Sequence, residues 1–514
     1  MPGLNAEMLE RLKARNEATG AELRASISSR WGDTDWAIRF PWWREPPEVR
    51  ILIYADGDNN FSDLAHVRTL LETNPFPFVR FKVTTAHRDE VQGDRPLARL
   101  TDLNLDDFDE LWLFGFNGAP ALPEEERELV ERFMAAPKNG GVLVTGDHRP
   151  LGRALGEIIP RVGAMRRWDL EAFGPDRNSS LEQGPDPNMS FNAQDEADDR
   201  PQTIHYTRFP IGAPAGVRLM PHPVLSGLDG PIDVLPDHDH EGEAMAPLVN
   251  AQNLATWPSS QAGHQEQPVV IAFGHVKDPD VHFKQFGVIS VYDGHTVGLG
   301  RIIADSSWHH WLNSNLRGFE PTPQGQAALK KFDNYFLNCG AWLAPPEMQN
   351  AMRLTAWWSV VWTDETVQIP PDAPMTVFGA QATKQLRNFA SACAVSEWVL
   401  GSDIFNKGLF NSALVQVSER ISLFNLSVEQ HLAGGILKAL MREVGPHHPE
   451  KKFPTEAPAD ELLETAIVNG TTEALADIEA QLDSETLSIR AAVARHRATI
   501  LASVENVSGN SITI

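Results

Sequence analysis

The chain has 514 residues, too many for one ordinary hydrophobic core, so two or three domains are expected. Its formal net charge of −25 argues against sequence-independent binding to nucleic acid or an anionic membrane, because both need a basic surface. The only cysteines, Cys339 and Cys393, exclude a disulfide framework and predict a cytoplasmic protein with both thiols in its core. No apolar run approaches the roughly 18–20 residues needed to span a bilayer.

The first part of the chain alternates between strand and helix patterns. A polar leader of helical character is followed by a strap rich in tryptophan and proline, and together they occupy residues 1–47. Buried strands are then predicted by apolar runs at residues 49–55, 78–84, 110–115 and 140–145. Helices are predicted around Leu64–Leu71, after Pro123 with its three following glutamates, and at residues 151–159. This alternation indicates βαβ units and a parallel sheet.

The rhythm breaks at residues 171–204, a long polar loop that we interpret either as a lid or as a structureless excursion. Regular structure resumes with predicted strands at 268–273, 286–292 and 301–304, and a closing helix at 327–343. Beyond Pro345 and Pro346 the pattern is helical, with segments at 381–400 and 409–443 and two more helices within 459–504. We therefore expect an α/β domain over 48–345, a mostly parallel sheet with helices on both faces, followed by an all-α domain over 346–514.

Polar side chains capable of chemistry follow several of the predicted strands. Asp56 and Asp58 follow the first, Asn117 the third, Asp147 and His148 the fourth, and Asp305, His309 and His310 the last. In open α/β sheets, ligands bind outside the carboxyl ends of the strands. The sequence therefore predicts a site at that edge of the sheet, with Asp56, Asp58, Asn117 and His310 as substrate-binding groups.

The last of these groups is the main catalytic candidate. A carboxylate beside a histidine prepares it for general acid–base work, so Asp305 and His309 are expected to act. The alternative is that one of the two adjacent histidines is packed inside and the other is solvated. Asp147 and His148 stand at a strand-to-helix turn, where Asp147 is either a catalytic carboxylate or a helix cap.

A histidine-rich segment near the middle of the chain is a candidate metal site. His238 and His240 share one face of an extended segment, and Glu241 or Glu243 could add a carboxylate, a set that suits zinc, iron or manganese. The alternative is a polar loop whose histidines bond to the backbone. No phosphate-cradling glycine motif occurs, so no nucleotide cofactor is expected.

Several elements together resemble the ThuA-like (trehalose-utilisation) family of the class I glutamine amidotransferase-like superfamily. They are the runs at 49–55, 111–114 and 140–144, His222-Pro-Val-Leu-Ser-Gly-Leu228, Gly298-Leu-Gly-Arg-Ile302 with His309, and Cys339-Gly-Ala-Trp-Leu343. The resemblance covers residues 48–345 and implies a flavodoxin-like fold, a link to carbohydrate metabolism and a site role for residues 237–243. The turn Thr145-Gly-Asp-His-Arg149 lacks the nucleophilic cysteine of amidotransferases, which argues against glutaminase activity.

Two hypotheses of different classes follow. In the first, the protein is an enzyme, a hydrolase or isomerase that acts on a small polar, carbohydrate-related metabolite, with or without a divalent metal. In the second, it is a non-catalytic ligand sensor or scaffold whose residues 346–514 form a homo-oligomer or dock a partner protein.

Overall fold

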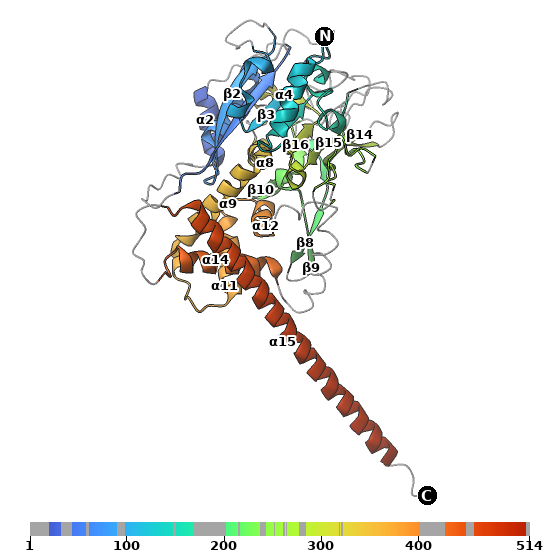
Figure 1. Ribbon diagram of the computed structural model, residues 1–514, viewed down its shortest axis with the longest axis vertical. Helices are drawn as coiled ribbons and strands as arrows, with labels where there is room; N and C mark the ends of the chain where they lie inside the picture. Colours follow the sequence, from blue (N-terminus) through green and yellow to red (C-terminus); the bar gives the residue numbers. More distant parts are fainter. Residues whose placement is uncertain are drawn as a thin grey trace.

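A central eight-stranded sheet organises the first two thirds of the molecule (Figure 1). The computed structural model describes residues 20–31, 44–57, 61–89, 98–147, 151–168, 202–213, 216–236, 243–250, 252–260, 263, 265–276, 284–317, 319, 322–400, 427–448 and 457–509. The predicted strap, most of the long loop and the segment 401–426 lie outside these residues. None of the described helices is both long and apolar enough to cross a membrane.

The sheet is mostly parallel, as the sequence predicts. Its strand order is β2-β1-β3-β4-β16-β15-β14-β7, and β2, β1, β3, β4 and β16 run parallel to one another. Their bounds are Arg80–His87 (β2), Glu48–Ala55 (β1), Glu110–Phe114 (β3), Gly141–Thr145 (β4) and Ile302–Asp305 (β16).

Three further strands extend this sheet in antiparallel fashion: β15 (Lys284–Tyr292), β14 (Val269–Val276) and β7 (His205–Tyr206). Only residues 277–283 separate β14 from β15, too few for the crossover that a parallel pair requires.

The two faces of the sheet bury alternate residues of each strand. Ile51, Ile53 and Trp112 face the larger core cluster, together with α3 (Ala65–Thr73) and α8 (Pro323–Leu343). Leu52, Leu111 and their neighbours face the second cluster, with α4 (Glu124–Met134) and the short α5 (Arg153–Gly156). Successive side chains of a strand point to opposite faces of the sheet, and both faces are buried here. These strands therefore appear in the sequence as continuous apolar runs.

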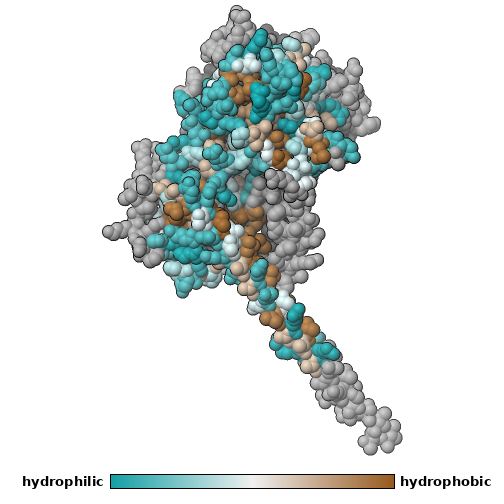
Figure 2. All heavy atoms as spheres, in the orientation of Figure 1, coloured by the Kyte–Doolittle hydropathy of each residue, from teal (hydrophilic) through white to brown (hydrophobic). Residues whose placement is uncertain are grey.

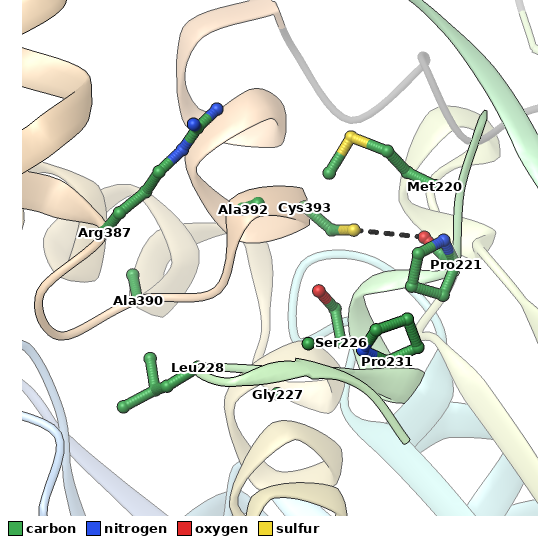
Figure 3. A pocket seen from close by; sticks show the side chains of 11 residues that line it. Met220, Pro221, Ser226, Gly227, Leu228, Pro231, Arg387, Ala390, Ala392 and Cys393 are labelled. Atoms are coloured by element: carbon green, nitrogen blue, oxygen red, sulfur yellow. Dashed lines mark hydrogen bonds between the residues drawn. The ribbon is translucent and has the colours of Figure 1, made fainter. Parts of the chain in front are cut away.

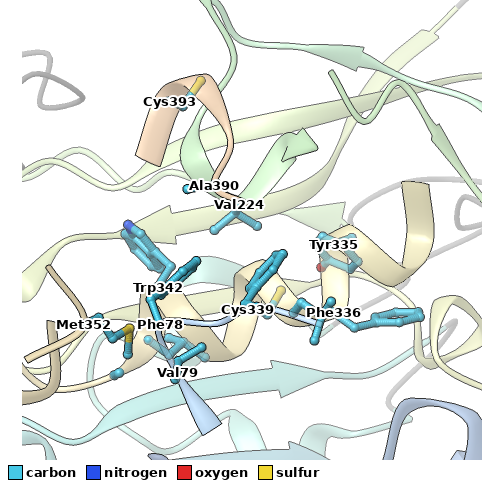
Figure 4. Packing of buried hydrophobic residues seen from close by; sticks show 14 of the residues in the cluster. Phe78, Val79, Val224, Tyr335, Phe336, Cys339, Trp342, Met352, Ala390 and Cys393 are labelled. Atoms are coloured by element: carbon cyan, nitrogen blue, oxygen red, sulfur yellow. The ribbon is translucent and has the colours of Figure 1, made fainter. Parts of the chain in front are cut away.

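The helical part of the chain packs on the same core as α8. Its helices are α9 (Pro346–Val361), α10 (Asp364–Val367), α11 (Met375–Leu386), α12 (Ala392–Leu400), α14 (Val428–Glu443) and α15 (Asp460–Gly509). Cys339 of α8 and Cys393 of α12 are both buried and form no disulfide, and their burial confirms the predicted core placement (Figure 4).

The helix predicted at 381–400 is two helices, α11 and α12, and the two helices predicted within 459–504 are one, α15. Within α15, Gly470 serves a close helix crossing and does not end the helix. A Cβ there would lie 2.3 Å from the carbonyl oxygen of Gly435 in α14.

Glycines bring the loops at the carboxyl edge of the sheet into backbone contact. A Cβ on Gly115, just after β3, would lie 2.5 Å from the Cα of Gly152. A Cβ on Gly152, whose φ is +90°, would lie 2.7 Å from the Cα of Gly146, just after β4. Side chains at these positions would force apart the loops that carry Asn117 and Asp147.

We predict that Gly152→Ala destabilises the protein by roughly 2–4 kcal/mol, because positive φ and steric overlap act together. Gly298→Ala is the matched control, since Gly298 has φ +76° but open space around its Cβ position. The control should cost only about 1 kcal/mol. Thermal unfolding of both variants measures the difference, and equal losses would contradict the close contact.

Candidate functional site

Four parallel strands deliver polar side chains to one edge of the sheet. Ala55 lies beside Phe114 in the register of β1 and β3, and Phe114 lies beside Thr145 in that of β3 and β4. Ala304 of β16 pairs with Val144 of β4. The residues that follow these strand ends form what we call the carboxyl-edge site: Asp56, Asn117, Asp147, Asp305 and the turn 306–311.

Asp305 is a buried acceptor at the centre of the turn that follows β16. Its Oδ1 accepts hydrogen bonds from His310 Nδ1 (2.6 Å) and the backbone N–H of Ser307 (3.2 Å). Its Oδ2 accepts from Trp311 Nε1 (3.0 Å) and the Tyr335 hydroxyl (2.7 Å). Asp305, His310, Trp311 and Tyr335 are all fully buried. Asp305 therefore pairs with His310 and not with His309. Asp305 and His310 both lie in the protein interior.

His309 pairs instead with Asp147, across the neighbouring strands β16 and β4. Its Nε2 lies 3.3 Å from Asp147 Oδ2, and its side chain is 16% exposed whereas that of Asp147 is 0% exposed. The Ser307 hydroxyl donates to Asp147 Oδ1 (3.1 Å) and accepts from the backbone N–H of His309 (3.2 Å). One serine thus fixes both members of the pair.

The ring of His309 is set up to exchange protons. Its Nδ1 lies 3.4 Å from Asn315 Oδ1, so oxygen atoms face both ring nitrogens. The Asp147 carboxylate, at ion-pair distance from Nε2, would stabilise a protonated ring. Such a histidine can protonate a substrate atom and take the proton back later.

Arg166 holds the two loops of this pair together. Its Nη2 donates to the carbonyl oxygens of Asp147 (2.6 Å) and Ser306 (2.8 Å), and its guanidinium lies over the ring of Trp168 at 4.5 Å. The side chain is 2% exposed. The sequence shows only a small basic patch here, and nothing in it indicates that Arg166 reaches the ends of β4 and β16.

A second polar group lies at the ends of β1 and β3. Asp56 Oδ1 accepts from the backbone N–H groups of Phe116 (2.5 Å) and Asn117 (3.0 Å). Among the described residues, Asp56 Oδ2 has no hydrogen-bond partner although it is buried. Burial raises the pKa of Asp56 to about 6.

The side chain of Asn117 faces a carboxylate that the sequence did not single out. Asn117 Nδ2 donates to Asp89 Oδ2 at 2.7 Å, and the backbone N–H of Gly57 donates to the same oxygen at 2.8 Å. Asp89 follows β2, so the strand-end pattern that identified Asp56 and Asn117 also applies to it.

An aromatic pair connects the two polar groups. Phe116 stacks on Trp308 with ring centroids 4.7 Å apart, and Trp308 lies 4.1 Å from the ring of His309. Asp56 and Asn117 therefore lie on one side of this stack and the His309–Asp147 pair on the other. At this edge Asn117 and His309 are partly exposed, whereas Asp56 and Asp147 are fully buried.

The predicted metal ligands are described only at Glu243. It forms β13 (Glu243–Ala244), which pairs with β5 (Arg166–Arg167), and its Oε2 lies 3.7 Å from Arg167 Nη2. Glu243 thus has a cationic partner. His238, His240 and Glu241, like Asp58 and His148, lie outside the described residues. Within the described residues, no group of three or more His, Cys, Asp or Glu side chains could hold a metal ion.

The motifs that carry the family resemblance meet at the opposite, amino end of β16. Arg301 is buried over the ring of Trp342 (4.6 Å), and Arg301 Nη2 bonds to Asp293 Oδ2 (3.0 Å) and to Glu397 Oε1 of α12 (2.9 Å). His222 packs edge-on against Trp342 at 4.9 Å, and burial lowers its pKa to about 3, which keeps it neutral. These motifs join the sheet to the helical part.

A cavity of about 200 Å³ lies at the same junction, between the segment 220–231 and helices α11 and α12 (Figure 3). Its lining is mainly apolar, and Arg387 is the charged residue among the described lining. Cys393 faces it, but its Sγ donates to the carbonyl oxygen of Pro221 at 3.2 Å. The cavity contains no acid–base pair, so we place the candidate site at the carboxyl edge of the sheet.

Comparison with protein-family models, curated proteins and solved structures found no match to this chain.

We predict that Asp56→Asn changes how stability depends on pH. Because burial raises the pKa of Asp56 from 3.8 to about 6, the native state resists its ionisation, and the protein loses stability as pH rises through this window. The stability of Asp56→Asn relative to wild type should therefore increase by on the order of 2 kcal/mol between pH 4.5 and pH 8. Melting temperatures across this range measure the effect.

Asp109→Asn is the control, because hydrogen bonds from Arg50 outweigh burial and lower the pKa of Asp109. Its contribution is complete above pH 4, so this variant should lose a similar amount of stability at both pH values. If the difference in stability between Asp56→Asn and wild type is also the same at both pH values, the raised pKa assigned to Asp56 is wrong.

Proposed function

We propose that the protein binds and transforms a small polar, carbohydrate-related metabolite at the carboxyl-edge site, with His309 as the proton-transferring group. The observation that carries this proposal is the contrast within the pair: a partly exposed imidazole held by a fully buried carboxylate. A purely structural pair would more commonly be buried on both sides, as Asp305 and His310 are.

The roles follow from position. Asp147 orients the ring of His309 and stabilises its charged form, and Ser307 and Arg166 fix the two loops. Asn117 is partly exposed and supplies an amide suited to hydroxyl groups, while the fully buried Asp56 holds the backbone of residues 116 and 117 in place. Proton transfer beside polar anchoring groups fits hydrolysis or isomerisation.

Glutaminase chemistry is not proposed. It requires a nucleophilic thiol at the strand-to-helix turn, where this chain has Asp147. Both cysteines are buried, Cys339 in α8 and Cys393 in α12, and burial raises the pKa of the Cys339 thiol well above its usual range.

We further propose a flavodoxin-like, ThuA-like origin for the sheet. The order β2-β1-β3-β4-β16 corresponds to the 2-1-3-4-5 order of that fold, in which ligands bind where β1 and β3 diverge. Asp56 and Asn117 occupy this place. The support is topological, and the link to carbohydrate chemistry rests on the resemblance of the sequence motifs alone.

A divalent metal remains an addition to this proposal, with His238, His240 and Glu241 as the candidate ligands. Glu243 fits such a role poorly because Arg167 pairs with it. Elemental analysis of untagged protein is expected to find about one zinc, iron or manganese per chain, lost in His238→Ala/His240→Ala. Metal-free protein after reconstitution would remove the metal from the proposal without affecting His309.

The main proposal is tested by screening sugars, sugar acids and polyols for binding and turnover. We predict that His309→Gln and Asp147→Asn each reduce turnover about 100-fold or more. The first removes the proton-transferring imidazole, and the second removes the carboxylate that orients it. His496→Gln, on an exposed part of α15, is the control and should retain full activity.

The melting temperatures of all three variants show whether the fold is intact. If both His309→Gln and Asp147→Asn keep the turnover of the wild type, the proposed mechanism is wrong. Ligand binding without turnover in the wild type would instead favour a non-catalytic sensor built on the same site.

A further inference from the structure

The distal half of α15 projects away from the rest of the molecule (Figure 1). The first turns of the helix are anchored, since Leu463, Ala466, Ile467 and Ala474 are buried. Beyond them, every described residue from 483 to 498 is exposed. Helices in proteins draw most of their stability from tertiary packing of an apolar face. A helix that extends this far without such packing is expected to have a partner.

An apolar stripe runs along this projecting part. Leu475, Leu482, Ile489 and Val493 recur at seven- and four-residue intervals, which places them on one side of the helix. Leu475, Ile489 and Val493 are 50%, 46% and 63% exposed. Figure 2 shows hydrophobic side chains at intervals along the projecting helix. Within the stripe, Leu482 is half-buried and packs against Ile478, next to Val428 of α14.

Charges of opposite sign flank the stripe in two separate blocks. Glu479 and Asp483 come first, and Arg490 and Arg497 follow. At about 100° per residue, all four lie roughly 60–100° from Leu482 around the helix, on the same side of the stripe. The charge pattern therefore reverses near the middle of the segment.

We propose that this segment pairs with the same segment of a second copy of the chain in antiparallel orientation. With the two-fold axis near residues 487 and 488, Leu482 lies opposite Val493 of the partner copy, and Thr486 lies opposite Ile489 of the partner copy. Glu479 and Asp483 then face Arg497 and Arg490 of the partner copy. In a parallel pair the same flanks of the two helices lie on opposite sides of the interface, so these four charges would not meet and the ion pairs would not form.

The surface beside the stripe has room for the partner's side chains. Ala494 and Ala498 leave a shallow hollow next to Ile489, Val493 and Arg497. The interface would be isologous, as in most homodimers.

The first test is the mass of the full chain in solution, by sedimentation over a series of concentrations. A dimer is expected, with twice the chain mass of 56.9 kDa. Ile489→Asp/Val493→Asp should be monomeric, with an unchanged melting temperature because both side chains project from the body. Val377→Asp on α11 is the control, since Val377 is as exposed as Ile489 (46% for both), and it should remain dimeric. A monomeric wild type, or a dimer that survives Ile489→Asp/Val493→Asp, would overturn the proposal.

The second test determines orientation. Leu482→Cys and Val493→Cys are prepared as separate proteins, with the natural cysteines buried in each. In the antiparallel pair a mixture should form the mixed disulfide under mild oxidation, while neither protein alone should cross-link, because like positions are too far apart. Efficient self-linking of either single variant would show a parallel pair and contradict the proposed arrangement.

Discussion

The carboxylate of Asp305 is the interaction on which the carboxyl-edge site depends. A polar group buried this completely is tolerated only when hydrogen bonds replace water, and both oxygens of Asp305 accept such bonds from the turn after β16 and from α8. These bonds fix the backbone of the turn 306–311. Since His309 is part of that turn, its position opposite Asp147 follows from the buried network beneath it.

The same turn explains how two adjacent histidines acquire different roles. Residues 308–310 form a 3₁₀ helix, in which successive side chains point roughly 120° apart. His310 therefore points inward to Asp305, and His309 points toward Asp147 at the surface. The prediction that Asp305 pairs with His309 and that His310 binds substrate is therefore wrong, and the alternative of one packed histidine describes His310. Which carboxylate pairs with which histidine depends on the register between β4 and β16.

Much of the sheet could be predicted from the sequence because strands buried on both faces are short apolar runs, and Asp56, Asn117 and Asp147 follow directly from their ends. Contacts between distant segments could not. Arg166 reaches Ser306 across 140 positions, and Gly470 resembles a helix break until Gly435 is seen against it. The motifs at His222 and Arg301, which carry the sequence resemblance, lie at the opposite end of β16, where both contact Trp342.

The central claim is that His309, held by Asp147, is the group that meets the ligand. The most direct measurement is the imidazole ¹H–¹⁵N spectrum of histidine-labelled protein, with His309 assigned through His309→Gln, as sugars, sugar acids and polyols are added. At least one compound is expected to shift the His309 signals strongly while those of the buried His310 move little. Binding that leaves His309 unshifted, or a panel that leaves all histidine signals unchanged, would contradict it.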